Sequence, residues 1–191
     1  MSIEHAILGL LSLNPLSGYD IKKMFAGSVA LAWSGNNNQI YKTLVKLHEQ
    51  GWVSRETQIQ ESSPTRKIYR ITPTGEEELR RWVFTNPEVP QVKNSFLIQL
   101  AWADALSTDE LDDLLKRYEN ELQIQLSMLS FQRQQSNVSP SGVSRDAYIH
   151  IPAARTPREK FLWNAILENW SSYYQAELDW VRKLRKGSKN F

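Results

Sequence analysis

The order of helical and strand patterns in the first 71 residues constrains the fold more than any other feature of this sequence. Apolar residues recur at spacings of three and four in segments 3–14, 17–27 and 36–51, which predicts three short amphipathic helices. Two β-prone runs follow, at 52–55 and 67–71, and a polar tip lies between them. Three short helices followed by a two-stranded ribbon form a winged helix-turn-helix domain.

The rest of the chain is dominated by helical patterns. Thr74 and Glu77 predict the capped start of a fourth helix. Ser107 and Glu110 do the same for a long helix whose apolar residues form a continuous seam, and such a seam requires a partner helix. Residues 156–159 predict the start of a last helix, with an N-cap threonine, a proline at the first position and a glutamate at the third.

We therefore expect a mainly α chain with two domains. Residues 1–86 are the predicted winged helix-turn-helix domain, with three helices and a two-stranded wing, and the proline-containing segment 87–94 is the predicted linker. Residues 95–191 are the predicted helical dimerisation domain. Segment 137–155, rich in Ser and Pro, is predicted to be a loop and has no assigned role.

Charge is distributed unevenly along the chain, although the net charge is only +2. Residues 22–70 contain eight basic and three acidic side chains, whereas the part from Thr85 onward contains thirteen of each. A basic N-terminal half joined to a neutral C-terminal half is typical of a nucleic-acid-binding protein with a separate assembly domain.

The composition disfavours several classes of function. The chain has no cysteine, its three histidines lie far apart, and no glycine-rich phosphate loop is present. We therefore predict no catalytic, cofactor-binding or metal-binding residues and no enzyme activity. The apolar N-terminal stretch is interrupted by Glu4, ends at Pro15 and lacks the features of a signal peptide. We expect a cytoplasmic protein that does not contact a membrane.

The third predicted helix has a polar face whose residue types suit DNA. Asn and Gln pair with adenine edges in the major groove, Lys reaches phosphates, and a helix N-terminus attracts a phosphate. The candidate DNA-binding residues of this helix are Asn36, Asn37, Asn38, Gln39, Tyr41, Lys42 and Lys46. In the wing, Arg66 and Lys67 beside the polar tip are predicted to contact the DNA backbone or the minor groove. An ordinary solvated helix and a plain hairpin surface are the alternative interpretations.

Five segments match, in order, the pattern of PadR-family transcriptional regulators. They are AILGLL (6–11), SGYDI (17–21), QIYKTLVKL (39–47), GWV (51–53) and RKIYRITPTG (66–75). The first eighty residues therefore resemble the DNA-binding domain of that family. The C-terminal half resembles the helical domain of the branch related to virulence-gene activators, through its helix layout and aromatic spacing.

The resemblance implies a bacterial homodimer that binds double-stranded DNA at an inverted-repeat operator and acts as a repressor released by a small-molecule effector. It assigns DNA contact to Tyr19, Gln39, Tyr41, Lys42, Arg66 and Lys67. His48 departs from the family pattern because the family usually has an acidic residue there, and the wing tip is rich in Ser and Thr instead of Gly. No effector residues are assigned. The alternative function is a winged-helix protein–protein interaction module that does not bind DNA.

Overall fold

The computed structural model describes residues 3–27, 37–60, 63–89, 94–135 and 154–189. They form two compact units, which meet in the sequence between Pro87 and Glu88. No helix within these ranges is both long enough and apolar enough to cross a lipid bilayer.

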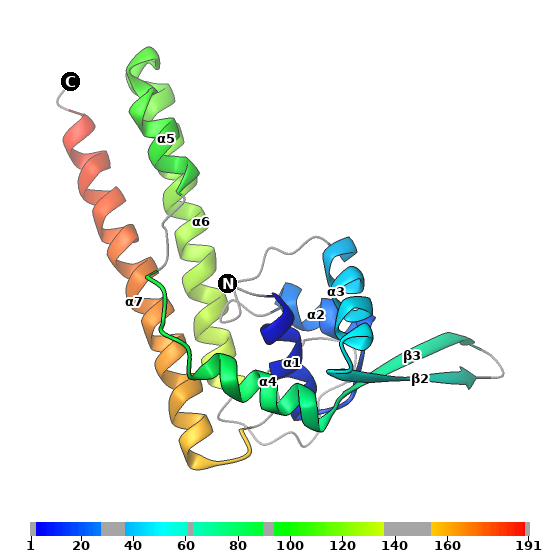
Figure 1. Ribbon diagram of the computed structural model, residues 1–191. Helices are drawn as coiled ribbons and strands as arrows, with labels where there is room; N and C mark the ends of the chain where they lie inside the picture. The colour runs from blue at the N-terminus through cyan, green and yellow to red at the C-terminus, as the bar shows by residue number, and fades with distance from the viewer. Residues whose placement is uncertain (1–2, 28–36, 61–62, 90–93, 136–153, 190–191) are drawn as a thin grey trace. The chain divides into compact units, whose positions relative to one another are not determined.

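The first unit is a winged helix-turn-helix, as predicted (Figure 1). Its described helices are α1 (Ile3–Leu13), α2 (Gly18–Gly27), α3 (Asn37–Glu49) and α4 (Pro73–Val83). Its described strands are β1 (Leu16–Ser17), β2 (Val53–Gln60) and β3 (Ser63–Ile71), which form an antiparallel sheet in the order β1-β3-β2.

Apolar side chains from α1, α2 and α3 meet in the core of this unit. The side chains that are 1% exposed or less are Ile7, Leu8, Ile21, Ile40, Leu44, Leu47 and Val53. Three of these lie on α3 at spacings of four and three, so they fix which face of α3 points inward. The opposite face of α3 must therefore lie in solvent.

The sheet is larger than the sequence predicts. Strand β3 begins at Ser63, so Arg66 lies within a strand, opposite Gln58, and not in the polar tip. The two-residue strand β1 adds a third member, with Leu16 opposite Tyr69. The polar segment between residues 56 and 66 lacks apolar alternation, but backbone hydrogen bonds between strands do not depend on the side chains.

The cap of α4 is Thr72, and the prediction that Thr74 caps it is wrong. The Thr72 side chain accepts a hydrogen bond from the Gly75 amide at 3.1 Å, and its backbone is extended, as an N-cap requires. Pro73 then occupies the first helical position, where its missing N–H costs nothing. Thr74 consequently lies inside the first turn.

Gly75 allows α4 to approach the turn that follows α3. A Cβ atom at this position would lie 2.1 Å from the Trp52 carbonyl oxygen, far inside van der Waals contact. The same carbonyl accepts a hydrogen bond from the Thr72 amide at 3.0 Å, and the Thr72 hydroxyl donates to the Gly51 carbonyl at 2.7 Å. The start of α4 is thus held directly against the end of α3.

The second unit is built on two long antiparallel helices (Figure 1). Its described elements are α5 (Ser95–Ala101), the 3₁₀ helix η1 (Ala103–Ala105), α6 (Thr108–Gln135) and α7 (Pro157–Ser188). Ser107 and Glu110 form the predicted capping box of α6, and Thr156 caps α7 by accepting a hydrogen bond from the Glu159 amide at 3.0 Å. The core between the helices contains Phe96, Leu115, Leu122, Leu178 and Val181.

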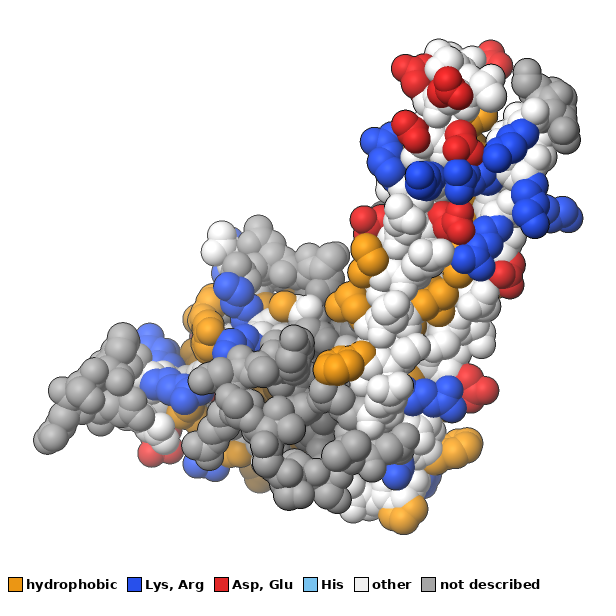
Figure 2. Space-filling model, turned by 180° about the vertical axis from the view of Figure 1, so that it is seen from behind, with side chains coloured by type: hydrophobic (Ala, Val, Ile, Leu, Met, Phe, Trp, Pro, Cys, Tyr) orange, Lys and Arg blue, Asp and Glu red, His pale blue; other side chains and the backbone are white. Residues whose placement is uncertain are grey.

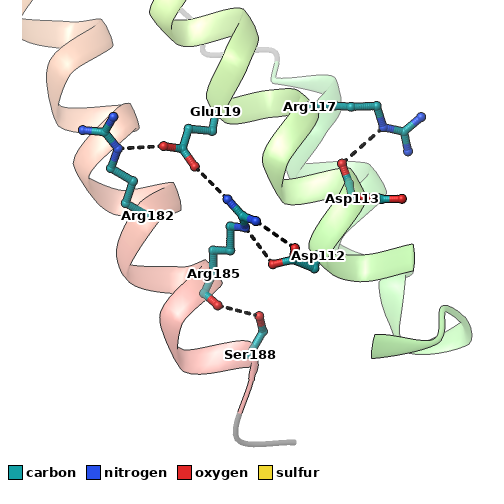
Figure 3. A network of polar contacts seen from close by, with 7 residues as sticks. All are labelled: Asp112, Asp113, Arg117, Glu119, Arg182, Arg185 and Ser188. Carbon is teal, nitrogen blue, oxygen red and sulfur yellow. Dashed lines mark hydrogen bonds and ion pairs between the residues drawn. The ribbon is translucent and has the colours of Figure 1, made fainter. Parts of the chain in front are cut away.

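An ion-pair network joins the end of α7 to the start of α6 (Figure 3). The Arg185 guanidinium donates to both carboxylate oxygens of Asp112, at 2.7 and 2.8 Å, and to Glu119 at 3.4 Å. Arg182 donates to the other oxygen of Glu119 at 2.8 Å. The hydrogen bonds from these arginines lower the pKa values of Asp112 and Glu119, so both carboxylates remain charged at neutral pH.

Candidate nucleic-acid interface

The outward face of α3 carries most of the candidate DNA-binding residues. Its exposed side chains include Asn38, Gln39, Tyr41, Lys42, Val45 and Lys46. Asn37 is the first residue of α3, and Asn36 lies outside the described residues. The structure therefore brings five of the seven predicted side chains of this segment together on one exposed surface.

Tyr41 lies against the first residue of α2, which is Gly18. A Cβ atom at Gly18 would lie 2.5 Å from Cε1 of the Tyr41 ring, so the ring occupies space that any other residue would fill. Tyr41 is nevertheless 47% exposed. The absence of a side chain at Gly18 thus sets the position of an exposed aromatic ring on α3.

Tyr19 lies next to Gly18 and is 54% exposed. The ammonium group of Lys23, one helical turn later, lies 4.9 Å from the centroid of the Tyr19 ring. This distance is within the range of a cation–π interaction. The start of α2 therefore places an exposed aromatic ring beside a half-buried cation.

Asp20 connects the start of α2 to the wing. Its carboxylate accepts hydrogen bonds from the Ser17 amide at 3.0 Å and the Ser17 hydroxyl at 2.7 Å, which forms the predicted capping box. The Arg66 guanidinium donates to the same carboxylate oxygen at 2.5 Å. Burial alone raises the pKa of Asp20, but the Ser17 hydrogen bonds and the Arg66 charge outweigh it and lower the pKa.

The four candidate cations divide into two classes. Arg66 is paired with Asp20, and Lys46 is paired with Glu4 at 2.6 Å. Lys42 and Lys67 are exposed, and neither forms an ion pair with the residues that the structure describes. Figure 2 shows Lys and Arg side chains along the described part of the wing. A phosphate can approach Lys42 or Lys67 without separating an existing pair, whereas at Arg66 and Lys46 it must compete with a carboxylate.

One exposed residue of this surface was not among the sequence predictions. Val45 is 48% exposed and lies four residues after Tyr41, so the two side chains are neighbours on the outward face of α3. The spacing of Ile40, Leu44 and Leu47 identifies the inward face and thereby places Val45 outside it. The helical spacing in the sequence could therefore have identified Val45 as exposed, but an apolar residue was not considered as a candidate for DNA contact.

Comparison with known proteins assigns both halves of the chain to described families. The model of the transcriptional regulator PadR-like family matches residues 7–81, and that of the virulence activator alpha C-terminal domain matches residues 92–187. The negative transcriptional regulator PadR of Bacillus subtilis (strain 168) is 33% identical over 151 residues, which are 78% of this chain and 83% of that protein. The chain belongs to the PadR-like family of transcriptional regulators. The resemblance inferred from the five ordered motifs is thus confirmed.

Solved structures of PadR proteins share the fold of this PadR-like chain. The crystal structure of Bacillus subtilis PadR in complex with operator DNA superposes with a TM-score of 0.75 at 27% identity, covering 97% of this chain and 98% of that one. The same protein in complex with p-coumaric acid gives a TM-score of 0.70 at 26% identity, covering 98% of both chains. The shared PadR-like fold therefore includes the helical half as well as the winged helix.

Proposed function

We propose that this PadR-like regulator is a homodimeric repressor that binds an inverted-repeat operator through α3 and the wing, and that a small-molecule effector releases it. One observation carries the proposal: the buried back of α3 fixes an outward face on which amide, aromatic and cationic side chains lie together. A helix of this kind enters the major groove, while the wing contacts the adjacent backbone. The protein acts in the cytoplasm and catalyses no reaction.

The structural environment of each side chain supports a particular role. Asn38 and Gln39, near the start of α3, are the proposed readers of base edges, because their residue types pair with adenine. Lys42 and Lys67 are the proposed phosphate contacts. The remaining proposed contact residues are Tyr19, Asn36, Asn37, Tyr41, Lys46 and Arg66.

The helical unit supports the homodimer. Its long helices expose large apolar side chains, which include Ile124, Met128, Phe131, Phe161, Leu162 and Ile166. Figure 2 shows apolar side chains following the long helices. Extended apolar surfaces on a helix pair indicate a protein interface, and a second copy of the chain presents the same surface. A two-fold dimer would then present two α3 helices to two half-sites about 34 Å apart.

The effector proposal is supported by the relationship to Bacillus subtilis PadR, which has been crystallised with p-coumaric acid. A regulator released by an effector binds that effector more tightly in the state with low affinity for DNA. Operator affinity should therefore fall when the effector is added, and effector affinity should fall when operator is added, by the same factor.

The test is selection of bound sequences from a random pool of double-stranded DNA at near-physiological salt. We expect the wild-type chain to enrich an inverted repeat. The logarithm of the binding constant falls linearly with the logarithm of the salt concentration, and this slope should become shallower by about 0.9 for each phosphate contact that is removed in each half-site. Lys42→Ala and Lys67→Ala should therefore flatten the slope, whereas Lys183→Ala on α7 should leave it unchanged.

The Lys183→Ala control distinguishes the loss of a specific phosphate contact from a general effect of lowering the net charge. If Lys183→Ala flattens the slope as much as Lys42→Ala does, the chain binds DNA without the proposed interface. If no sequence is enriched over the Lys42→Ala/Lys67→Ala variant, the interaction-module alternative replaces the proposal.

A further inference from the structure

Val45 is an exposed aliphatic side chain on the proposed DNA-reading face. It lies three residues after Lys42 and four after Tyr41, and residues at these spacings adjoin each other on a helix surface. Among the residues of the first unit whose side chains the structure describes, the other large apolar side chains that are at least as exposed lie on α2 or at the end of α4, at Tyr19, Val83 and Phe84. Within the described residues of α3, Val45 is therefore the exposed aliphatic side chain.

Neither packing nor helix propensity accounts for valine at this position. The inward face of α3 is already filled by Ile40, Leu44 and Leu47, which are 1% exposed or less. At an exposed helix position a β-branched residue is a weaker helix former than Lys, Arg, Gln or Glu. A single exposed aliphatic side chain is common on protein surfaces, so the evidence for a partner is the position of Val45 beside Tyr41 and Lys42 on the face proposed to meet DNA.

Neighbouring charges restrict what that partner is. Lys42, which forms no ion pair with the residues that the structure describes, lies one helical turn before Val45 on the same exposed surface, so the partner combines negative charge with a small apolar group. DNA has this combination in the major groove, where thymine presents its C5 methyl group between two phosphate backbones. Cytosine presents no methyl group at this edge and offers an amino donor, for which valine has no acceptor.

We propose that Val45 reads the C5 methyl group of one thymine in each half-site, an inference that rests on the proposed operator binding. Tyr41 and Lys42 position the helix, and Val45 supplies selectivity for thymine over cytosine at one base pair. The side chain thus acts as a specificity determinant without forming a hydrogen bond.

Deoxyuridine substitution tests this contact because it removes the methyl group and leaves the base pairing intact. Each thymine of the selected operator is replaced singly, and affinity is measured by fluorescence anisotropy. For the wild-type chain, we expect one substitution per half-site to weaken binding about four-fold, the effect of losing one buried methyl group. Thymines elsewhere in the operator serve as internal controls.

Val45→Ala should abolish the response at that position. The variant should bind the thymine and uracil operators equally, whereas Val83→Ala, which shortens an exposed valine at the end of α4, should retain the four-fold difference. A thymine-to-uracil effect that persists in Val45→Ala would overturn the inference, as would a wild-type chain that tolerates every substitution. Failure to select any operator would instead refute the proposed function.

Discussion

Replacing Gly18 by alanine moves Tyr41 without changing any residue of α3. The added Cβ atom would lie 2.5 Å from Cε1 of the ring, whereas ordinary carbon–carbon contacts begin at about 3.5 Å. The ring must therefore shift by about 1 Å, and because it is half exposed it can do so by rotating towards solvent.

The structure separates the expected effect on stability from the effect on binding. Rotating a side chain by up to about 30° from its preferred torsion angle costs at most about 1.5 kcal/mol, so the free energy of unfolding should fall by about 1.5 kcal/mol or less. Loss of one hydrogen bond from the Tyr41 hydroxyl to DNA should weaken operator binding by about two- to ten-fold.

Urea denaturation followed by circular dichroism measures the free energy of unfolding. Fluorescence anisotropy with the selected operator measures the binding affinity. Gly9→Ala is the matched control because a Cβ atom at Gly9, in α1, meets nothing within 4 Å. This variant should bind the operator normally and gain about 0.5–1 kcal/mol of stability, the usual benefit of alanine over glycine in a helix.

A double-mutant cycle with Tyr41→Ala decides whether the effect passes through the ring. We expect Gly18→Ala to weaken operator binding in the wild-type background and to have no further effect in the Tyr41→Ala background. Equal weakening of operator binding by Gly18→Ala in both backgrounds would show that the glycine does not act through the Tyr41 ring. The same conclusion follows if Gly18→Ala leaves operator affinity unchanged while Tyr41→Ala lowers it.

Three further predictions concern stability. Gly75→Ala should lower the free energy of unfolding by about 1–3 kcal/mol in urea denaturation, because the new Cβ atom would meet the Trp52 backbone carbonyl, which cannot rotate away. Leu115→Ala removes a fully buried side chain between α6 and α7 and should lower it by about 2–5 kcal/mol, whereas the exposed Leu97→Ala should have a much smaller effect. Burial, together with a hydrogen bond to Glu177, raises the pKa of Tyr118 from its ordinary value of 10 to about 12. The stability gained from this neutral phenol is therefore present below pH 10 and lost as the pH rises through about 12, and the phenolate absorbance that titrates near pH 12 should decrease in Tyr118→Phe by the contribution of one tyrosine.

The helices and their buried faces could be predicted from the sequence because they depend on local spacing. Leu44 and Leu47 recur with the period of a helix whatever the rest of the chain does, and the same holds for Leu115 and Leu122. The capping boxes are equally local, since Ser17 and Asp20 are three residues apart.

The ion pairs of the candidate site could not be predicted because their partners are distant in the sequence. Arg66 meets Asp20 across 46 positions, and Lys46 meets Glu4 across 42. A count of basic residues treats all four candidate cations alike, whereas tertiary structure gives two of them carboxylate partners. The roles of the individual side chains at DNA remain predictions that the variants above can test.

The contact of Gly75 with the Trp52 carbonyl has a consequence for regulation. Because the start of α4 packs against and is hydrogen-bonded to the turn that ends α3, we expect the two helices to move together. If the proposed effector acts on the winged helix through the chain that follows α4, it would displace α3 and α4 together, and the outward face of α3 would keep its arrangement of side chains.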